Sequence, residues 1–188
     1  MRRFLLLLAL AAVMTAGAQD AKELYQRGKE LCDAKDYEHA FPLLKTAAEK
    51  GHRKAQYRLG RCYDKGRGVA GDDSTAFYWY SKSAEQGYAK AQYQVGECYK
   101  EGTGVAKDRK KAFAWHMKAA RQDHAEAQYR VGKSFLSGKG TTADPKKARS
   151  WLSKAVKNPK GGAGILTKLR KKAAAGDEDA ASVLQLIE

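Results

Sequence analysis

Three cysteines, Cys32, Cys62 and Cys98, are the side chains of this 188-residue chain best suited to covalent or metal chemistry. Cys62 and Cys98 are 36 residues apart and each directly precedes a tyrosine, which indicates equivalent repeat positions and not a metal or redox pair. Because three is an odd number, at least one thiol stays free or pairs between molecules. Two interpretations stay open: buried free thiols that behave as small apolar side chains, or a bridge between Cys32 and Cys62.

The sequence gives little support for a histidine metal site or for a catalytic serine. The four histidines are His39, His52, His116 and His124. None belongs to an H-E-x-x-H motif or accompanies a C-x-x-C pair, so we predict no metal site and expect His116 to be partly solvated. The motifs G-x-S-x-G, S-x-x-K and K-T-G do not occur, and the G-x-G pairs lack the G-K-[ST] ending of a P-loop. We therefore predict that the chain is not an enzyme and binds no cofactor.

An internal repeat of 36 residues dominates the sequence. Three segments align at this spacing without gaps. In the first segment the shared positions are Ala55, Gln56, Tyr57, Gly60, Gly66, Gly68, Asp72, Ala76 and Trp79. The same residue types recur 36 and 72 positions later. Because a missed repeat misassigns a whole fold, this periodicity decides the predicted architecture.

Each segment predicts two helices joined by a glycine-containing turn. Ala55, Leu59 and Tyr63 share one face of the first helix. Gly60 costs that helix about 1 kcal/mol relative to alanine, so we expect a neighbouring helix to pack closely over it. The later glycines end the first helix, and Asp72 is suited to cap the second. The repeated tryptophans are predicted to be core, and the buried face of the second helix to consist of Ala76, Trp79 or Tyr80, Ser83 and Ala84.

A single helix pair cannot bury both of its faces, so consecutive pairs must stack on one another. We therefore predict an all-α fold, an α-solenoid of antiparallel helix pairs, as a single repeat domain over residues 19–188. Its predicted parts are a first unit with a shorter loop (20–53), three repeats (54–89, 90–125 and 126–160) and a closing segment (161–188) with helices over 165–175 and 178–187.

The first 18 residues have the layout of a secretory signal peptide. Two arginines precede an apolar run over residues 4–13, and Ala16-Gly17-Ala18 forms a small-x-small cleavage site. The alternative is an anchor helix, but the run is shorter than the about 20 residues that a bilayer requires. No later segment is predicted to span a membrane. We expect an exported protein, periplasmic or secreted after cleavage near Ala18.

Positive charge is concentrated in the C-terminal half. Residues 107–172 carry 19 Lys and Arg against 4 Asp and Glu, whereas residues 19–106 carry 15 against 13. Nucleic acid is the usual partner of such a basic stretch, but export argues against it. An acidic protein partner or an anionic component of the cell wall is the better prediction.

Two strings, A-Q-Y-R-L-G-R-C-Y-D-K-G-R-G-V and A-Q-Y-Q-V-G-E-C-Y-K-E-G-T-G-V, resemble Sel-one-like repeats (SLR), a branch of the tetratricopeptide superfamily. The third copy, residues 126–160, is similar, and the first unit has the shorter loop of an ordinary tetratricopeptide repeat. The resemblance implies a right-handed superhelix and an adaptor that brings proteins together. Some exported, cysteine-rich members have been associated with cell-wall glycan or β-lactam binding, although this chain lacks their two cysteines per repeat.

The resemblance also implies that the first helices of the pairs line the concave side of the solenoid. The residues expected to face a partner there are Tyr57, Arg61, Tyr93, Glu97, Tyr129 and Lys133. Tyrosine is enriched at the energetic centres of interfaces, but the three tyrosines could equally pack between adjacent repeats. We predict a non-catalytic scaffold of the cell envelope that binds an extended peptide or protein. The alternative is a peptidoglycan or cell-wall glycan binder, or a weak β-lactam hydrolase.

Overall fold

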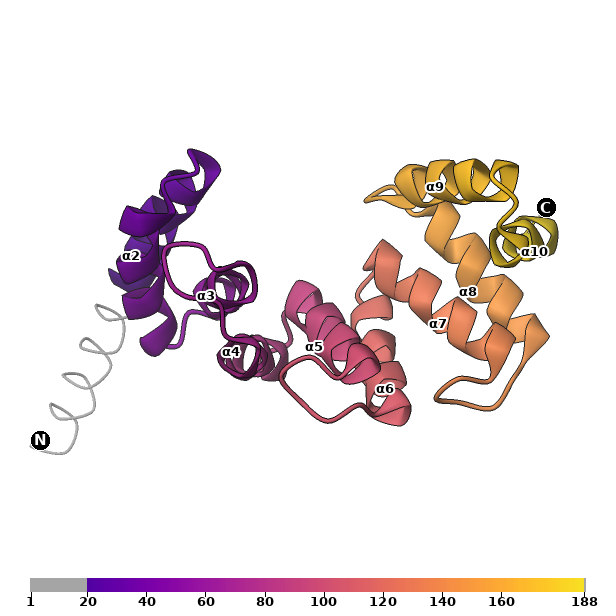
Figure 1. The fold of residues 1–188 in the computed structure, drawn as a ribbon, viewed down its shortest axis with the longest axis horizontal. Coiled ribbons are helices and arrows are strands. Elements are labelled where there is room, and N and C mark those ends of the chain that lie inside the picture. Colours follow the sequence, from indigo (N-terminus) through magenta and orange to yellow (C-terminus); the bar gives the residue numbers. More distant parts are fainter. Residues whose placement is uncertain (1–19, 188) are drawn as a thin grey trace, which may run out of the picture. The chain divides into compact units, whose positions relative to one another are not determined.

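The computed structural model describes residues 20–187. The signal peptide predicted over residues 1–18 lies outside these residues. In the described range every regular element is an α-helix and none is a strand (Figure 1), which confirms the predicted all-α class. None of the helices in this range is both long enough and apolar enough to cross a membrane.

The described residues divide into two compact units, one that ends at Tyr88 and one that begins at Ala89. The N-terminal unit contains a helix over residues 20–33, α2 (Tyr37–Glu49), α3 (Arg53–Lys65) and α4 (Asp73–Glu85). The C-terminal unit contains α5 (Ala89–Glu101), α6 (Arg109–Ala120), α7 (Ala125–Ser137), α8 (Pro145–Lys157), α9 (Gly162–Ala174) and α10 (Glu178–Ile187). The helix pairs fall on the predicted repeats, and the extent of the predicted domain stays a prediction.

Polar and glycine signals at the helix ends act as the sequence indicates. Asp72, Asp108 and Asp144 each accept a hydrogen bond from the backbone N–H three residues further on, and so cap α4, α6 and α8. Gly66 and Gly138, directly after α3 and α7, have left-handed φ angles of 59° and 69°. Glycine adopts this conformation without a Cβ penalty, so both predicted signals are confirmed.

The glycine inside each first helix lies directly against the second helix of its pair. A Cβ placed on Gly60 would stand 2.7 Å from the Tyr80 ring, and one on Gly132 would stand 2.6 Å from Leu152 Cγ. Such distances leave no room for a side chain. The close packing predicted from the repeated glycine is therefore confirmed.

The residues opposite these glycines occupy the buried position of the second helix. Tyr80, His116 and Leu152 are no more than 2% exposed. The prediction that His116 is partly solvated was wrong, because this position faces the first helix of the pair. The tryptophans one residue earlier are only partly buried, and Trp115 carries the Lys118 ammonium 3.9 Å from its ring centroid. Trp79 and Trp151 pack against buried clusters, so the prediction of tryptophan as core is confirmed in part. None of the three tryptophans is fully buried, because this position stands at the edge of the buried face.

The last two helices close the C-terminal unit (Figure 1). Ile165 and Leu169 of α9 share one buried cluster with Ala180 and Val183 of α10. The predicted closing helices are confirmed, and α9 begins three residues before its predicted start.

Candidate partner-binding site

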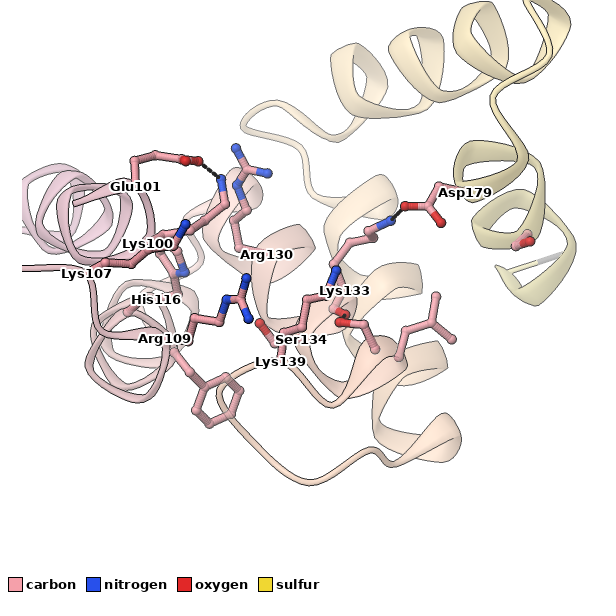
Figure 2. Close-up of a pocket in the computed structure, with 15 residues that line it drawn as sticks. Lys100, Glu101, Lys107, Arg109, His116, Arg130, Lys133, Ser134, Lys139 and Asp179 are labelled. Carbon is pink, nitrogen blue, oxygen red and sulfur yellow. Dashed lines mark hydrogen bonds and ion pairs between the residues drawn. The ribbon is translucent and has the colours of Figure 1, made fainter. Parts of the chain in front are cut away.

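A pocket of about 630 Å³ lies within the C-terminal unit (Figure 2). Its walls come from α5, α6, α7 and α10 and from the turns that follow α5 and α7. The positively charged lining residues are Lys100, Lys107, Arg109, Arg130, Lys133 and Lys139, and the negatively charged ones are Glu101 and Asp179. The pocket therefore has a clear excess of positive charge.

Two of these cations have carboxylate partners that also line the pocket. Lys100 Nζ lies 2.6 Å from a Glu101 carboxylate oxygen, and Lys133 Nζ lies 2.8 Å from one of Asp179 (Figure 2). The Asp179 side chain is 85% exposed, so solvent screens its pair with Lys133 and makes it weak. A carboxylate from a ligand can replace Asp179 at small cost.

Lys107, Arg109 and Lys139 have no carboxylate within ion-pair distance in the part of the chain that the structure describes, and we refer to them as the unpaired cations. All three are exposed and stand in the turns or beside them. Gly140 packs so tightly on the Arg109 backbone that a Cβ would overlap its carbonyl, which holds the turn after α7 beside the start of α6. A second hollow, which shares Lys107 and Arg109, extends toward Lys110.

Apolar side chains complete the lining of the pocket. Ala112 and Phe113 come from α6, and Leu136 comes from α7. Phe113 is fixed by an edge-on contact with Phe135, with ring centroids 5.3 Å apart. Apolar walls with a few convergent charged groups are typical of ligand-binding pockets.

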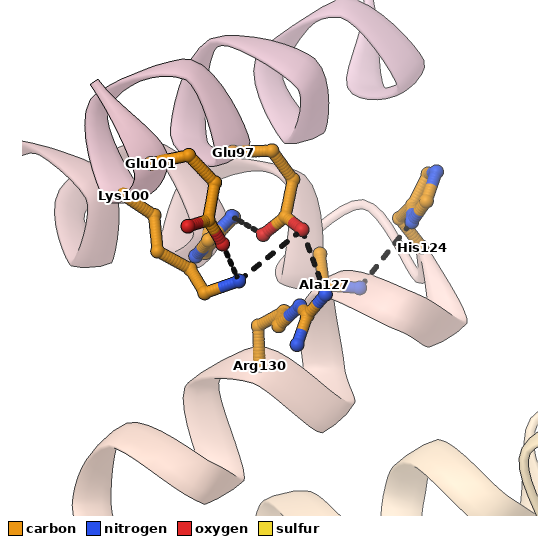
Figure 3. A network of polar contacts seen from close by, with 7 residues as sticks. Glu97, Lys100, Glu101, His124, Ala127 and Arg130 are labelled. Carbon is orange, nitrogen blue, oxygen red and sulfur yellow. Dashed lines mark hydrogen bonds and ion pairs between the residues drawn. The ribbon is translucent and has the colours of Figure 1, made fainter. Parts of the chain in front are cut away.

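Glu97 links α5 to both α6 and α7 (Figure 3). Its Oε2 lies 2.7 Å from Arg130 Nη2, and its Oε1 lies 3.1 Å from His116 Nε2. Both atoms are buried, and within residues 20–187 neither makes a hydrogen bond of good geometry, so their 3.1 Å approach is an electrostatic contact. Burial opposes ionisation of Glu97, but the His116 contact and the charges of Arg130 and Lys100 lower its pKa to about 2. Glu97 is thus an anion that joins three helices.

The three predicted partner tyrosines make packing contacts inside their units. Tyr57 contacts two other tyrosine rings of the N-terminal unit, at centroid distances of 5.8 and 5.3 Å. Tyr93 stacks on His124 at 4.9 Å, and Tyr129 packs against the buried cluster of α8 to α10. Burial raises the pKa of both Tyr57 and Tyr93. These contacts agree with the packing interpretation, and a role toward a partner stays a prediction.

The other three predicted residues lie in different surroundings. Lys133 lines the basic pocket, Arg61 lines a small hollow of the N-terminal unit, and Glu97 is held in its ion pairs. The unpaired cations are missing from the predicted set, because Lys107 and Lys139 stand in turns and Arg109 is the first residue of α6, positions that helix periodicity does not address. The positive charge over residues 107–172 is the sequence signal that points to them.

Within residues 20–187 no three His, Cys, Asp or Glu side chains are grouped as metal ligands. The fold and the pocket define a class of protein: a helical repeat protein with a charged, partly apolar pocket on its surface.

A family model described as Sel1 repeat matches residues 10–52, 53–88, 89–124 and 125–159. The last three matches coincide with the pairs α3–α4, α5–α6 and α7–α8. The chain belongs to the Sel1 repeat family, which confirms the resemblance found in the sequence. Proteins of this family generally mediate protein–protein interaction, and the repeat is generally a non-enzymatic scaffold.

Two solved structures are similar to this chain. A Sel1 repeat protein from Oxalobacter formigenes is 34% identical with a TM-score of 0.69, and the match covers 83% of this chain and 72% of that one. A protective antigen of uropathogenic Escherichia coli strains, which displays an SLR fold, is 32% identical with a TM-score of 0.73. That match covers 88% of this chain but 40% of the antigen. Both similarities support the predicted solenoid class.

Proposed function

We propose that this chain is a non-catalytic adaptor of the cell envelope that binds an extended, acidic segment of a partner protein. The observation that carries the proposal is the presence of three unpaired cations, Lys107, Arg109 and Lys139, at one partly apolar pocket. Membership of the Sel1 repeat family supports a protein partner.

An acidic segment suits the pocket for electrostatic and steric reasons. Its carboxylates meet cations that have no carboxylate within ion-pair distance among residues 20–187, so ion pairs form without the loss of existing ones. An apolar side chain of the same segment can pack on Phe113 and Leu136. A volume of about 630 Å³ accommodates a few residues of an extended chain. The expected ligand is therefore a short acidic stretch with one apolar anchor.

The predicted partner residues on the first helices belong to the same proposal. Lys133 lines the pocket and is expected to exchange Asp179 for a ligand carboxylate. Tyr57, Arg61, Tyr93 and Tyr129 are proposed as further contacts, each within its own unit, and Glu97 as the group that fixes Arg130.

Export is also part of the proposal, and it rests on the layout of residues 1–18. The test is N-terminal sequencing of the protein recovered from envelope and culture fractions of its host. We expect Gln19 to be the first residue of the mature chain. A chain that keeps Met1 and stays in the cytoplasm contradicts this part of the proposal.

The binding test uses a labelled peptide of Asp and Glu with one Leu, and measures fluorescence anisotropy with the purified chain. The variant combines Lys107→Glu, Arg109→Glu and Lys139→Glu, which reverses the unpaired cations. We expect its affinity to fall by at least about tenfold, which corresponds to roughly 1.4 kcal/mol.

A matched control separates the pocket from net charge. Lys146→Glu, Arg149→Glu and Lys157→Glu make the same charge change at exposed positions of α8 that do not line the pocket. We expect this control to lose far less affinity. Equal losses in the two variants, or none in either, contradict the pocket as the binding site. Sedimentation with purified peptidoglycan tests the glycan alternative. If the wild type sediments with peptidoglycan and only the pocket variant does not, the ligand of the pocket is a glycan and not a peptide.

A further inference from the structure

Cys32 packs against the buried cluster of the N-terminal unit that contains Cys62, although the two cysteines are 30 residues apart in the sequence. Cys32 comes from the helix over residues 20–33, and Cys62 comes from α3. Both line a hollow of about 120 Å³ that opens to solvent. Cys62 is only 3% exposed, whereas Cys32 is partly exposed. One thiol of the pair is thus accessible, and the other is buried beside it.

The surroundings of the pair are cationic. Arg58, Arg61 and Arg67 line the same hollow, against a single carboxylate, Asp33. Arg58 lies 3.7 Å from Asp33, so one of the three positive charges is partly neutralised. Positive charge beside a cysteine favours its thiolate, which is the nucleophilic form.

Exposure divides the roles of the two thiols. Cys32 is the accessible thiol beside the arginines, and Cys62 is buried behind it. The contact with Cys62 and the charge of Arg58 lower the pKa of Cys32 to about 7, whereas the same contact and burial raise the pKa of Cys62. Cys32 is therefore suited to attack and Cys62 to resolve the adduct.

We propose that Cys32 and Cys62 form a reactive dithiol, in which Cys32 attacks small-molecule disulfides and Cys62 resolves the adduct into an intramolecular disulfide. The site does not depend on the binding of a protein partner. Nothing in the repeat pattern requires the contact, because Cys32 lies in the atypical first unit and has no cysteine at the equivalent positions, Asp64 and Lys100.

The proposed reaction has two exchange steps with a disulfide reagent RSSR as the oxidant. The Cys32 thiolate forms a bond to one reagent sulfur, the reagent S–S bond breaks, and RS⁻ leaves and takes up a proton. In the adduct the Cys32 sulfur carries no negative charge, so it no longer opposes ionisation of Cys62. Its thiolate then attacks the Cys32 sulfur and expels the second RS⁻. The protein loses two electrons and two protons, and the reagent ends as two thiols.

The experiment treats the reduced, purified chain with oxidised glutathione at neutral pH and maps the products by non-reducing peptide mass spectrometry. We expect a Cys32–Cys62 disulfide as the stable product, with Cys98 modified much more slowly. Cys62→Ala is expected to stop at a Cys32–glutathione adduct, and Cys32→Ala is expected to leave Cys62 unmodified. Circular dichroism checks that both variants fold.

Three outcomes overturn the proposal. One is a wild-type chain in which the Cys32–glutathione adduct persists without closing. Another is a Cys98 thiol that reacts as fast as Cys32. The third is a disulfide that joins Cys98 to either of the other two cysteines. All three are read from the wild-type chain, so they do not depend on the folding of a variant.

Discussion

Gly132 of α7 lies directly under Leu152 of α8, so close that a Cβ on the glycine would stand 2.6 Å from Leu152 Cγ. Glycine at this position lets the two helix backbones approach each other closely. The close packing offsets the lower helix propensity of glycine. The same relationship joins Gly60 to Tyr80 in the N-terminal unit. This contact packs the two helices of each repeat against each other, and the first prediction tests it.

Gly132→Ala is expected to destabilise the protein by about 1–3 kcal/mol, because the added methyl group overpacks the contact with Leu152. Gly164→Ala in α9 is the control, since no atom lies within 4 Å of a Cβ at that position. There we expect a gain of roughly 0.5–1 kcal/mol from helix propensity. Urea denaturation measures both. A stabilised Gly132→Ala variant would refute the close packing.

Two histidines cap helices through a nitrogen that must be unprotonated. His52 Nδ1 accepts a hydrogen bond from the Ala55 N–H at 3.2 Å, and His124 Nδ1 accepts one from Ala127 at 3.3 Å. Burial lowers the pKa of both histidines below the ordinary 6.5. Nearby lysines add to this effect, and the Glu126 carboxylate partly opposes it at His124. Their caps therefore stabilise the fold above pH 6.5, and this contribution is lost as the pH falls through the lowered pKa.

The second prediction follows from these caps. Asparagine also accepts a hydrogen bond at a helix start but does not titrate, so the double variant His52→Asn, His124→Asn keeps the caps in acid. Between neutral and mildly acidic pH we expect the wild type to lose about 1 kcal/mol per cap relative to the variant. The unfolding free energy is measured across this range. Parallel pH profiles for the two proteins would contradict the prediction.

Glu97 gives the third prediction. Its pKa of about 2 lies below the ordinary 4.5, so the ionised form stabilises the fold above pH 4.5 and that contribution disappears as the pH falls toward 2. Glu97→Gln is expected to cost about 1.5–3 kcal/mol at neutral pH, because His116 and Arg130 lose a charged partner. The variant should also lose less stability than the wild type as the pH falls from 4.5 toward 2. Thermal unfolding from neutral to strongly acidic pH tests both, and an unchanged profile would count against the ion pairs.

The fourth prediction concerns the thiol pair. The rate of Cys32 alkylation by iodoacetamide is expected to rise with pH around a midpoint near 7, as its pKa indicates. Cys62→Ala removes the contact that lowers this pKa and should move the midpoint toward the ordinary 9.0. Peptide mass spectrometry follows the rate at Cys32 alone. A midpoint that does not move in Cys62→Ala would show that the two thiols do not interact.

The sequence predicted those features of the fold that arise from repeated local chemistry. The caps at Asp72 and Asp144 and the packing over Gly60 recur every 36 residues, so periodicity reveals them. Trp115 and His116 were assigned to the wrong environments, because adjacent helix residues differ by about 100° and the edge of a buried face is narrow. The tryptophan was predicted to be core, whereas the packing buries the His116 imidazole.

The sequence indicated the pocket only through the excess of Lys and Arg over residues 107–172. Lys107 and Lys139 stand in turns, and their positions depend on how those turns pack against α6, which a helical period does not encode. Cys32 lies outside the three segments that align without gaps, so the 36-residue period does not predict its packing against the cluster that contains Cys62. The sequence left that pairing as one of two alternatives.

Binding of an acidic segment at the pocket is tested most directly by an NMR titration of the isotope-labelled chain with the acidic, leucine-containing peptide. We expect amide chemical shifts to change most around Lys107, Arg109 and Lys139 and around Phe113 and Leu136. Largest shifts at α8 or α9, outside the pocket, or no shifts at all at concentrations where the peptide binds, would contradict it.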